Sequence, residues 1–126
     1  MSQSMRDFEI SRPCGATTLI AKQYYIVKQH TDGTLILAAA ATDKIVGVLQ
    51  NKPAVGSAGL VRIGGTTKVI AGGAINPGAW VTSDGSGKAV ATTTDKDVVF
   101  GKYLGTAAAA SGDIIEVQIH IFTLSA

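Results

Sequence analysis

The segment Ile114–Phe122 reads IIEVQIHIF, and it alternates apolar and polar side chains along most of its length. One side of an extended chain would carry only apolar residues: Ile115, Val117, Ile119 and Ile121. The other side would carry polar ones: Glu116, Gln118 and His120. Since successive side chains of a strand point to opposite faces, this period of two predicts a β-strand with one buried face.

Upstream of this segment, short β-branched runs alternate with Gly, Pro and Asp, a spacing that is typical of a compact β-sandwich or barrel. We expect strands at Tyr24–Gln29, Thr34–Leu37, Ile45–Gln50, Leu60–Ile63, Thr67–Ile70, Ala79–Ser83, Lys88–Ala91 and Val98–Leu104. Asp32-Gly33 and Asp84-Gly85 indicate tight hairpins, and Asn76-Pro77-Gly78 indicates a type II turn. The alanine tracts Ala38–Ala41 and Ala107–Ala110 predict short helical turns.

A weak internal repeat accompanies this pattern, with a constant offset between matching positions. It aligns Gly33 with Gly87, Asp43 with Asp97 and Gly47 with Gly101. The repeat predicts two similar β-units, residues 18–71 and 72–125, that share one core. Chance agreement in turn spacing between β-segments is the alternative explanation.

Residues 1–17 precede the repeat, so we predict an extended N-terminal arm followed by a β-domain over residues 18–126. Phe8, Ile10 and Arg12 alternate here with Asp7, Glu9 and Ser11, which suits a strand added to a neighbouring subunit. The predicted interface residues of the arm are Arg6, Phe8, Ile10 and Arg12. The alternative is a frayed terminus. On the arm interpretation, deleting residues 2–12 should leave the β-domain folded.

Composition narrows the range of partners. The chain has 126 residues, net charge +2 and 46% hydrophobic residues, but only 16% are charged, against about 25% in ordinary soluble domains. This balance indicates either a neutral β-protein surface or a surface that partners cover. The basic residues are scattered, which disfavours nucleic-acid binding. No apolar run is long enough to span a membrane. Near the N-terminus, charged residues stand where a signal peptide needs an apolar stretch, so no signal peptide is expected.

Catalytic and metal-binding patterns are absent from the sequence. Cys14 is the single cysteine, and both histidines, His30 and His120, lie far from it in sequence, so neither a nucleophile nor a zinc site is indicated. Asp84-Gly85-Ser86-Gly87-Lys88 lacks the first glycine of a phosphate-binding loop. We therefore expect a protein that is not an enzyme and needs no cofactor, and we expect Cys14→Ser to be neutral.

The stretch Ala71–Ala91, AGGAINPGAWVTSDGSGKAVA, resembles the phage capsid cement (decoration) proteins, a family long catalogued as a domain of unknown function. The resemblance continues through Val98–Gly105, Thr106–Ala110 and Gly112–Ile121, and it covers roughly residues 17–121. Ala79 departs from the Asp that many members carry. The resemblance implies a β-tulip-like, non-enzymatic virion protein that binds the outer capsid surface at contacts between capsomers.

The partners that the resemblance implies are the major capsid protein and further copies of the chain, as a homotrimer or a dimer, without nucleic acid or membrane. It also implies synthesis in the host cytoplasm. One alternative is another phage structural β-domain, associated with the tail tube or a fibre. A second, different in class, is a nucleic-acid-binding β-barrel.

Overall fold

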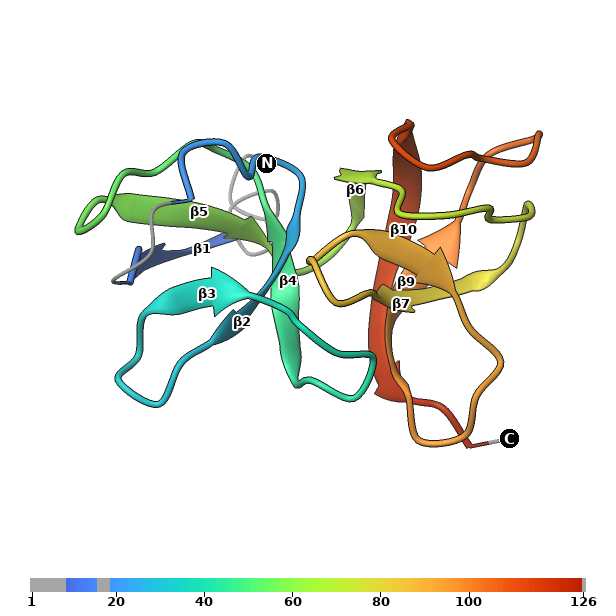
Figure 1. The fold of residues 1–126 in the computed structure, drawn as a ribbon, viewed down its shortest axis with the longest axis horizontal. Coiled ribbons are helices and arrows are strands. Elements are labelled where there is room, and N and C mark those ends of the chain that lie inside the picture. The colour runs from blue at the N-terminus through green and yellow to red at the C-terminus, as the bar shows by residue number, and fades with distance from the viewer. Residues whose placement is uncertain (1–8, 16–18, 126) are drawn as a thin grey trace.

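The computed structural model describes residues 9–15 and 19–125, and they form two five-stranded antiparallel sheets (Figure 1). The first sheet contains β1 (Glu9–Pro13), β2 (Ile26–Gln29), β3 (Leu35–Leu37), β4 (Ile45–Leu49) and β5 (Ala58–Arg62). The second contains β6 (Thr66–Ile70), β7 (Trp80–Ser83), β8 (Ala89–Ala91), β9 (Val98–Tyr103) and β10 (Ile114–Thr123). The architecture is all-β and compatible with the predicted sandwich.

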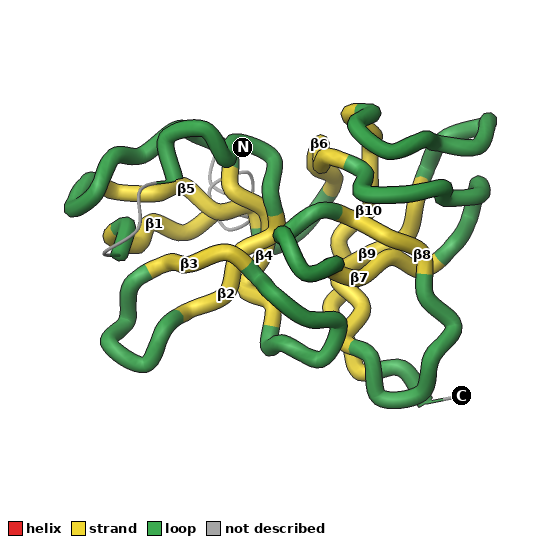
Figure 2. Tube along the Cα trace, viewed as in Figure 1, coloured by secondary structure: helices red, strands yellow, loops and turns green. Residues whose placement is uncertain are grey.

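Every predicted strand is present, but the two predicted helical turns are wrong: the described residues contain no helix (Figure 2). In the first tract, Ala38 is fully buried and the Asp43 carboxylate accepts hydrogen bonds from the backbone N–H groups of Ala39 and Ala40. In the second tract, Ala109 forms a bridge with Ile75. Competing backbone partners thus override the helix propensity of alanine.

The turns follow the predicted chemistry with one shift. Gly78 has a φ of 81°, and Ala79 N–H donates to Asn76 O at 3.1 Å, as a type II turn requires. Gly33 closes the first hairpin with a φ of 87°. In the second hairpin the left-handed residue is Gly87, with a φ of 78°, rather than Gly85.

The strands follow the same order in both sheets. The first sheet runs β1-β5-β4-β2-β3 and the second runs β6-β10-β9-β7-β8. Backbone hydrogen bonds also recur at matching positions of the repeat: Ala38 donates to Ile26 O and Thr92 to Trp80 O, each at 3.0 Å. The edge strands β1 and β6 begin at Glu9 and Thr66. The number of residues between these two strand starts is slightly larger than the number that separates Gly33 from Gly87.

Two clusters of buried side chains form the core. The first sheet has its own cluster around Val27, Leu35 and Val61. A larger cluster around Phe100 combines residues of the second sheet with Ile26 and Val48 of the first. The second cluster therefore joins the two sheets, which stand side by side in Figure 1.

The described part of the N-terminal segment differs from the predicted extended arm. β1 pairs with β5 of its own chain from Glu9↔Arg62 to Pro13↔Ala58, so these residues are not shown as an extended arm. Ile10 packs against the core of the first sheet, and Cys14 is only 3% exposed. Residues 1–8, 16 and 17 of the predicted arm lie outside the described residues.

Candidate interaction surfaces

The reactive side chains are dispersed. Within residues 9–15 and 19–125, no three His, Cys, Asp or Glu side chains come together in a way that could hold a metal ion. His30 Nδ1 lies 3.2 Å from Asp32 Oδ1 at an exposed hairpin. Hydrogen bonds from Thr34, with a smaller contribution from His30, hold the pKa of Asp32 below its ordinary value. The contacts among His30, Asp32 and Thr34 account for the geometry of the hairpin, and no catalytic role is needed to explain them.

Of the predicted arm residues, the structure places Ile10 and Arg12 on β1, whereas Arg6 and Phe8 lie outside the described residues. Ile10 is half-buried and Arg12 is exposed. Sequence reasoning missed the ion pair that fixes β1: Arg62 Nη2 lies 2.9 Å from Glu9 Oε2. Alternation at residues 7–12 predicted a strand, but it gave no sign of the strand's partner.

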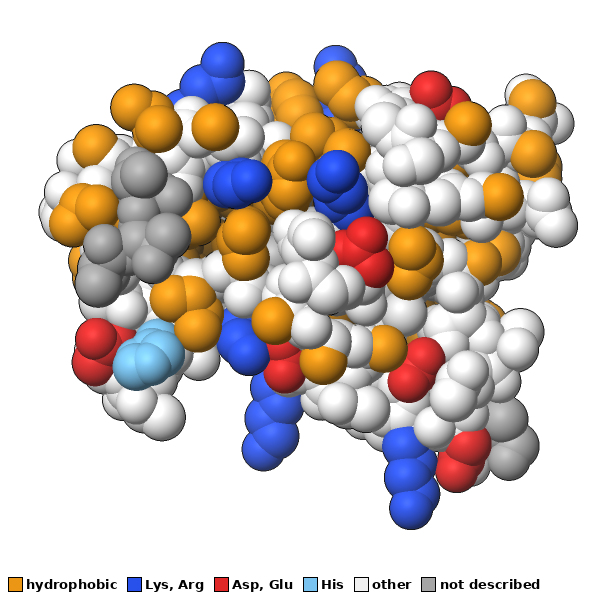
Figure 3. Space-filling view, viewed as in Figure 1, with side chains coloured by type: hydrophobic (Ala, Val, Ile, Leu, Met, Phe, Trp, Pro, Cys, Tyr) orange, Lys and Arg blue, Asp and Glu red, His pale blue; other side chains and the backbone are white. Residues whose placement is uncertain are grey.

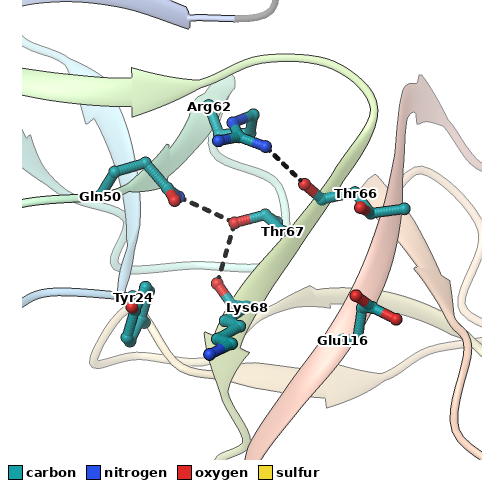
Figure 4. A pocket seen from close by; sticks show the side chains of 7 residues that line it. All are labelled: Tyr24, Gln50, Arg62, Thr66, Thr67, Lys68 and Glu116. Atoms are coloured by element: carbon teal, nitrogen blue, oxygen red, sulfur yellow. Dashed lines mark hydrogen bonds between the residues drawn. The ribbon is translucent and has the colours of Figure 1, made fainter. Parts of the chain in front are cut away.

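A polar hollow of about 250 Å³ lies where the two sheets meet (Figure 4). It is lined by Tyr24, Gln50, Arg62, Thr66, Thr67, Lys68 and Glu116. Hydrogen bonds connect several of its lining residues: Gln50 Nε2 donates to Thr67 Oγ1 at 2.8 Å, and Arg62 Nη1 to Thr66 O at 2.9 Å. These bonds connect β5 and the end of β4 with β6, so the residues that line the hollow help to hold the two sheets together.

Three aromatic rings gather on the second sheet. Trp80 of β7 meets Phe122 of β10 edge-on, with ring centroids 4.9 Å apart, and His120 lies 5.1 Å from Phe122 and 6.1 Å from Trp80. Trp80 stays 36% exposed. The register of β10 against β9 shifts between Ile119 and Phe122, which breaks the predicted alternation there. Because a bulge re-aims side chains, sequence periodicity alone could not place this group.

The surface carries further apolar side chains. Those exposed by more than a third are Ile20, Val55, Leu60, Trp80, Leu104, Ile114 and Ile121. Basic side chains are spread over the face shown in Figure 3 and form no stripe there. The described part of the chain contains no helix long and apolar enough to cross a membrane. The exposed apolar side chains are of the kind that contacts with other proteins can cover.

Known proteins share this sequence pattern and this fold. A solved structure described as the head fiber gp8.5 N base in bacteriophage phi29 matches with a TM-score of 0.69 and 22% identity, over 94% of this chain and 99% of that chain. No curated protein matches the chain. Residues 13–119 match the phage cement proteins, which confirms the resemblance predicted from Ala71–Ala91. The family and the fold together support a structural role in a phage virion. The match spans both sheets, and the chain belongs to the phage cement protein family.

Proposed function

We propose that this protein decorates and stabilises the outer surface of a tailed-phage capsid by binding at contacts between capsomers, without catalysing a reaction. The observation that carries the proposal is the family match over residues 13–119, which includes strands of both sheets. The low content of charged residues and the exposed apolar side chains support it, because partner-covered surfaces need fewer charges.

The proposed partners are the major capsid protein and further copies of the chain, assembled as a homotrimer. Binding of this kind is multivalent: each contact is modest, but the second and third contacts of one oligomer benefit from a high effective concentration. Arg6 and Phe8, with Ile10 and Arg12 on β1, form the proposed N-terminal part of the capsid interface. Phe8 would contribute about 1.5–3 kcal/mol if binding buried it fully.

Capsids that lack this protein provide the direct test. Purified protein added to such expanded capsids should appear in a reconstruction as density outside the shell at the contacts between capsomers. The decorated particles should also survive heating that ruptures undecorated ones. Density confined to the tail, or the absence of binding, would contradict the proposal.

The N-terminal contribution needs a shorter deletion than the sequence suggested. Removing residues 2–12 would destroy β1 and expose the edge of β5. Removing residues 2–8 leaves the Glu9–Arg62 ion pair in place. The shorter deletion should leave the fold intact and lower capsid occupancy; Ser11→Ala, an exposed change on β1, serves as control. Unchanged occupancy would assign binding to the sheets alone.

A role at the base of a head fibre is the second candidate, and the fold shared with the head fiber gp8.5 N base favours it. Copy number separates the two. A decoration protein at every capsomer contact should be among the most abundant proteins of the virion, whereas a fibre at selected sites should be much rarer. Quantitative mass spectrometry of purified virions measures this directly.

We also propose that the two sheets are two similar β-units derived from one ancestral unit. Shared strand order and recurring hydrogen bonds support this. The offset that relates Gly33 to Gly87 holds from β2 to β4, and it is slightly larger between β1 and β6. The β1 and β6 edges would then belong to the units as well.

A further inference from the structure

Inside the chain, a hairpin of the second sheet packs on a face of the first. Ile26 and Val48 form a cross-strand pair and are fully buried among side chains of the second sheet. Ile26 N–H donates to Gly87 O at 2.7 Å. Gly87 lies in the β7–β8 hairpin, close to Leu37 and Ala38 of the first sheet. The face bearing Ile26 and Val48 is called the covered face below.

The second sheet has a matching face. In the repeat, Ile26 aligns with Trp80 and Val48 aligns with Lys102, and Trp80 and Lys102 also form a cross-strand pair. Both are exposed, and the rings of His120 and Phe122 form an aromatic group with Trp80. We call Trp80, Lys102, His120 and Phe122 the open face. It corresponds to the covered face, but no hairpin of the described chain packs on it.

The first sheet has the matching hairpin, His30–Thr34 between β2 and β3. Gly33 aligns with Gly87 in the repeat and has the same left-handed backbone, with φ values of 87° and 78°. A side chain at Gly87 would press against Ile26 O, whereas one at Gly33 would meet nothing within 4 Å. The first hairpin is therefore free where the second is packed.

The contact between the sheets is head-to-tail, because it joins a face of one sheet to a hairpin of the other. Such a contact leaves one face and one hairpin unused in every chain, and these can join chain to chain into a ring or a filament. We propose that the β2–β3 hairpin of one copy docks on the open face of the next copy, so that copies repeat the contact that joins the two sheets.

The chemistry of the two surfaces agrees with this occupant. Aromatic anchors such as Trp80 and Phe122 are the side chains that dominate protein interfaces when they become buried. Lys102 places a positive charge on the open face, and Asp32 places a negative charge on the hairpin. This inference names the surface for the self-association proposed above, and it therefore rests on that proposal.

A matched pair of glycine variants tests the hairpin. Asn tolerates left-handed backbone, and both Gly33 and Gly112 combine positive φ with open space where a side chain would stand. Gly33→Asn and Gly112→Asn should therefore fold equally well. In sedimentation velocity, Gly33→Asn should weaken self-association about tenfold or more, the loss expected for obstructing one important contact. Gly112→Asn should associate like the unmodified protein.

Mixing two variants tests the head-to-tail arrangement. Trp80→Ala damages the open face, and Ile114→Ala, which removes a side chain 58% exposed elsewhere on the second sheet, is its control. At a concentration where the unmodified protein only just associates, Trp80→Ala and Gly33→Asn should each be monomeric alone. An equimolar mixture should form a heterodimer, because the intact hairpin of the Trp80→Ala chain can dock on the intact face of the other.

Several results would overturn the inference: an unmodified chain that stays monomeric at about 100 µM, where even weak interfaces associate, variants that assemble normally, or a mixture that forms no heterodimer. The thermal transition of each variant checks that it is folded, and if Trp80→Ala does not fold, Trp80→Lys replaces it in the mixture. The self-association experiments contain no capsid. If the protein failed to bind capsids, the measured self-association would therefore remain valid.

Discussion

The two sheets differ in which side chains they bury, even at positions where their backbones correspond. The first sheet turns Ile26 and Val48 into the core, whereas the second turns the matching residues, Trp80 and Lys102, to the surface. The strand order is shared, so backbone pairing does not depend on which face is covered. A single β-framework can thus carry either a buried or an exposed face, depending on a few side chains.

The turn before β2 shows how strongly the framework constrains the chain. Tyr24 has a φ of 69°, an unusual conformation for a bulky residue, and the matching Gly78 has a φ of 81°. Tyr24 N–H donates to Leu49 O at 2.7 Å, and Gly78 N–H donates to Tyr103 O at 3.1 Å. The hydrogen bond to the neighbouring strand holds the backbone in place even where the residue type disfavours it.

The strongest test of the correspondence uses the glycines at the centres of β4 and β9. A side chain at Gly47 would overlap the carbonyl of Arg62, and one at Gly101 would overlap the carbonyl of Gln118. Since backbone atoms of a paired strand cannot move aside cheaply, Gly47→Ala and Gly101→Ala should each lower the free energy of unfolding by about 3 kcal/mol. Urea unfolding measures both losses.

Gly73→Ala is the matched control, because its added carbon would meet Val90 at 3.7 Å, an ordinary contact. It should change the free energy of unfolding by less than about 1 kcal/mol. If one of the two central glycines tolerated alanine and the other did not, the sheets would differ in packing at their centres despite the common strand order.

A smaller effect separates the sheets at the loop before β4 and β9. Asp43 bonds Lys28 at 2.8 Å in the first sheet, whereas the matching Asp97 accepts a hydrogen bond from Thr92. Burial acts to raise the pKa of Asp43, but the bonds from Lys28, Ala39 and Ala40 outweigh it and hold the pKa below its ordinary value. Asp43→Asn should cost about 1–2 kcal/mol at neutral pH.

The pH dependence has a definite sign. With the pKa of Asp43 lowered by folding, the unfolded chain binds more protons in the acid range, so the stabilisation is present above about pH 4 and is lost as the pH falls further. The difference between the unmodified protein and Asp43→Asn should therefore shrink on acidification. Ser11→Ala, an exposed change on β1 that removes no titratable group, should follow the pH profile of the unmodified protein. Equal pH profiles for Asp43→Asn and the unmodified protein would contradict the assignment.

The sequence was most informative where local chemistry decides the structure. The strand at Ile114–Phe122 and the turn at Asn76–Gly78 required no knowledge of partners, and both are confirmed, although the alternation of buried and exposed side chains holds only as far as the bulge after Ile119. The helical turns failed because the alanine tracts have other partners: Ala39 and Ala40 donate to the nearby Asp43 carboxylate, and Ala109 pairs with Ile75, far away in the chain. Long-range pairing of this kind leaves no local signature.

Long-range pairing also explains why the sequence did not reveal the candidate sites. Nothing in Phe8–Arg12 reveals that β1 pairs with β5, which lies much later in the chain, or that Glu9 faces Arg62. Trp80 and Phe122 meet only because β7, β9 and β10 lie side by side and β10 has a bulge. Cys14 was predicted to lie in an arm, but it is only 3% exposed and belongs to the core of the first sheet; the neutrality of Cys14→Ser stays a prediction.

The smallest expected effect concerns Cys14 itself. Cys14 forms a parallel bridge with Leu35, and Ala71 forms the matching bridge with Ala89, so the two residues hold corresponding places. Both are buried, at 3% and 0% exposure. Because an alanine already serves at this place in the second sheet, Cys14→Ala should lower the free energy of unfolding by no more than about 1 kcal/mol, close to the transfer term for one small apolar group.

Thermal and urea unfolding of Cys14→Ala, with the exposed Ser11→Ala as control, measures this difference. A loss above about 2 kcal/mol would mean that the sulfur fills space in the first core that has no counterpart in the second, since an unfilled cavity adds to the transfer cost. The correspondence of the two sheets would then be limited to the backbone. A small loss would extend it to the packing at the edge where β1 leaves its sheet.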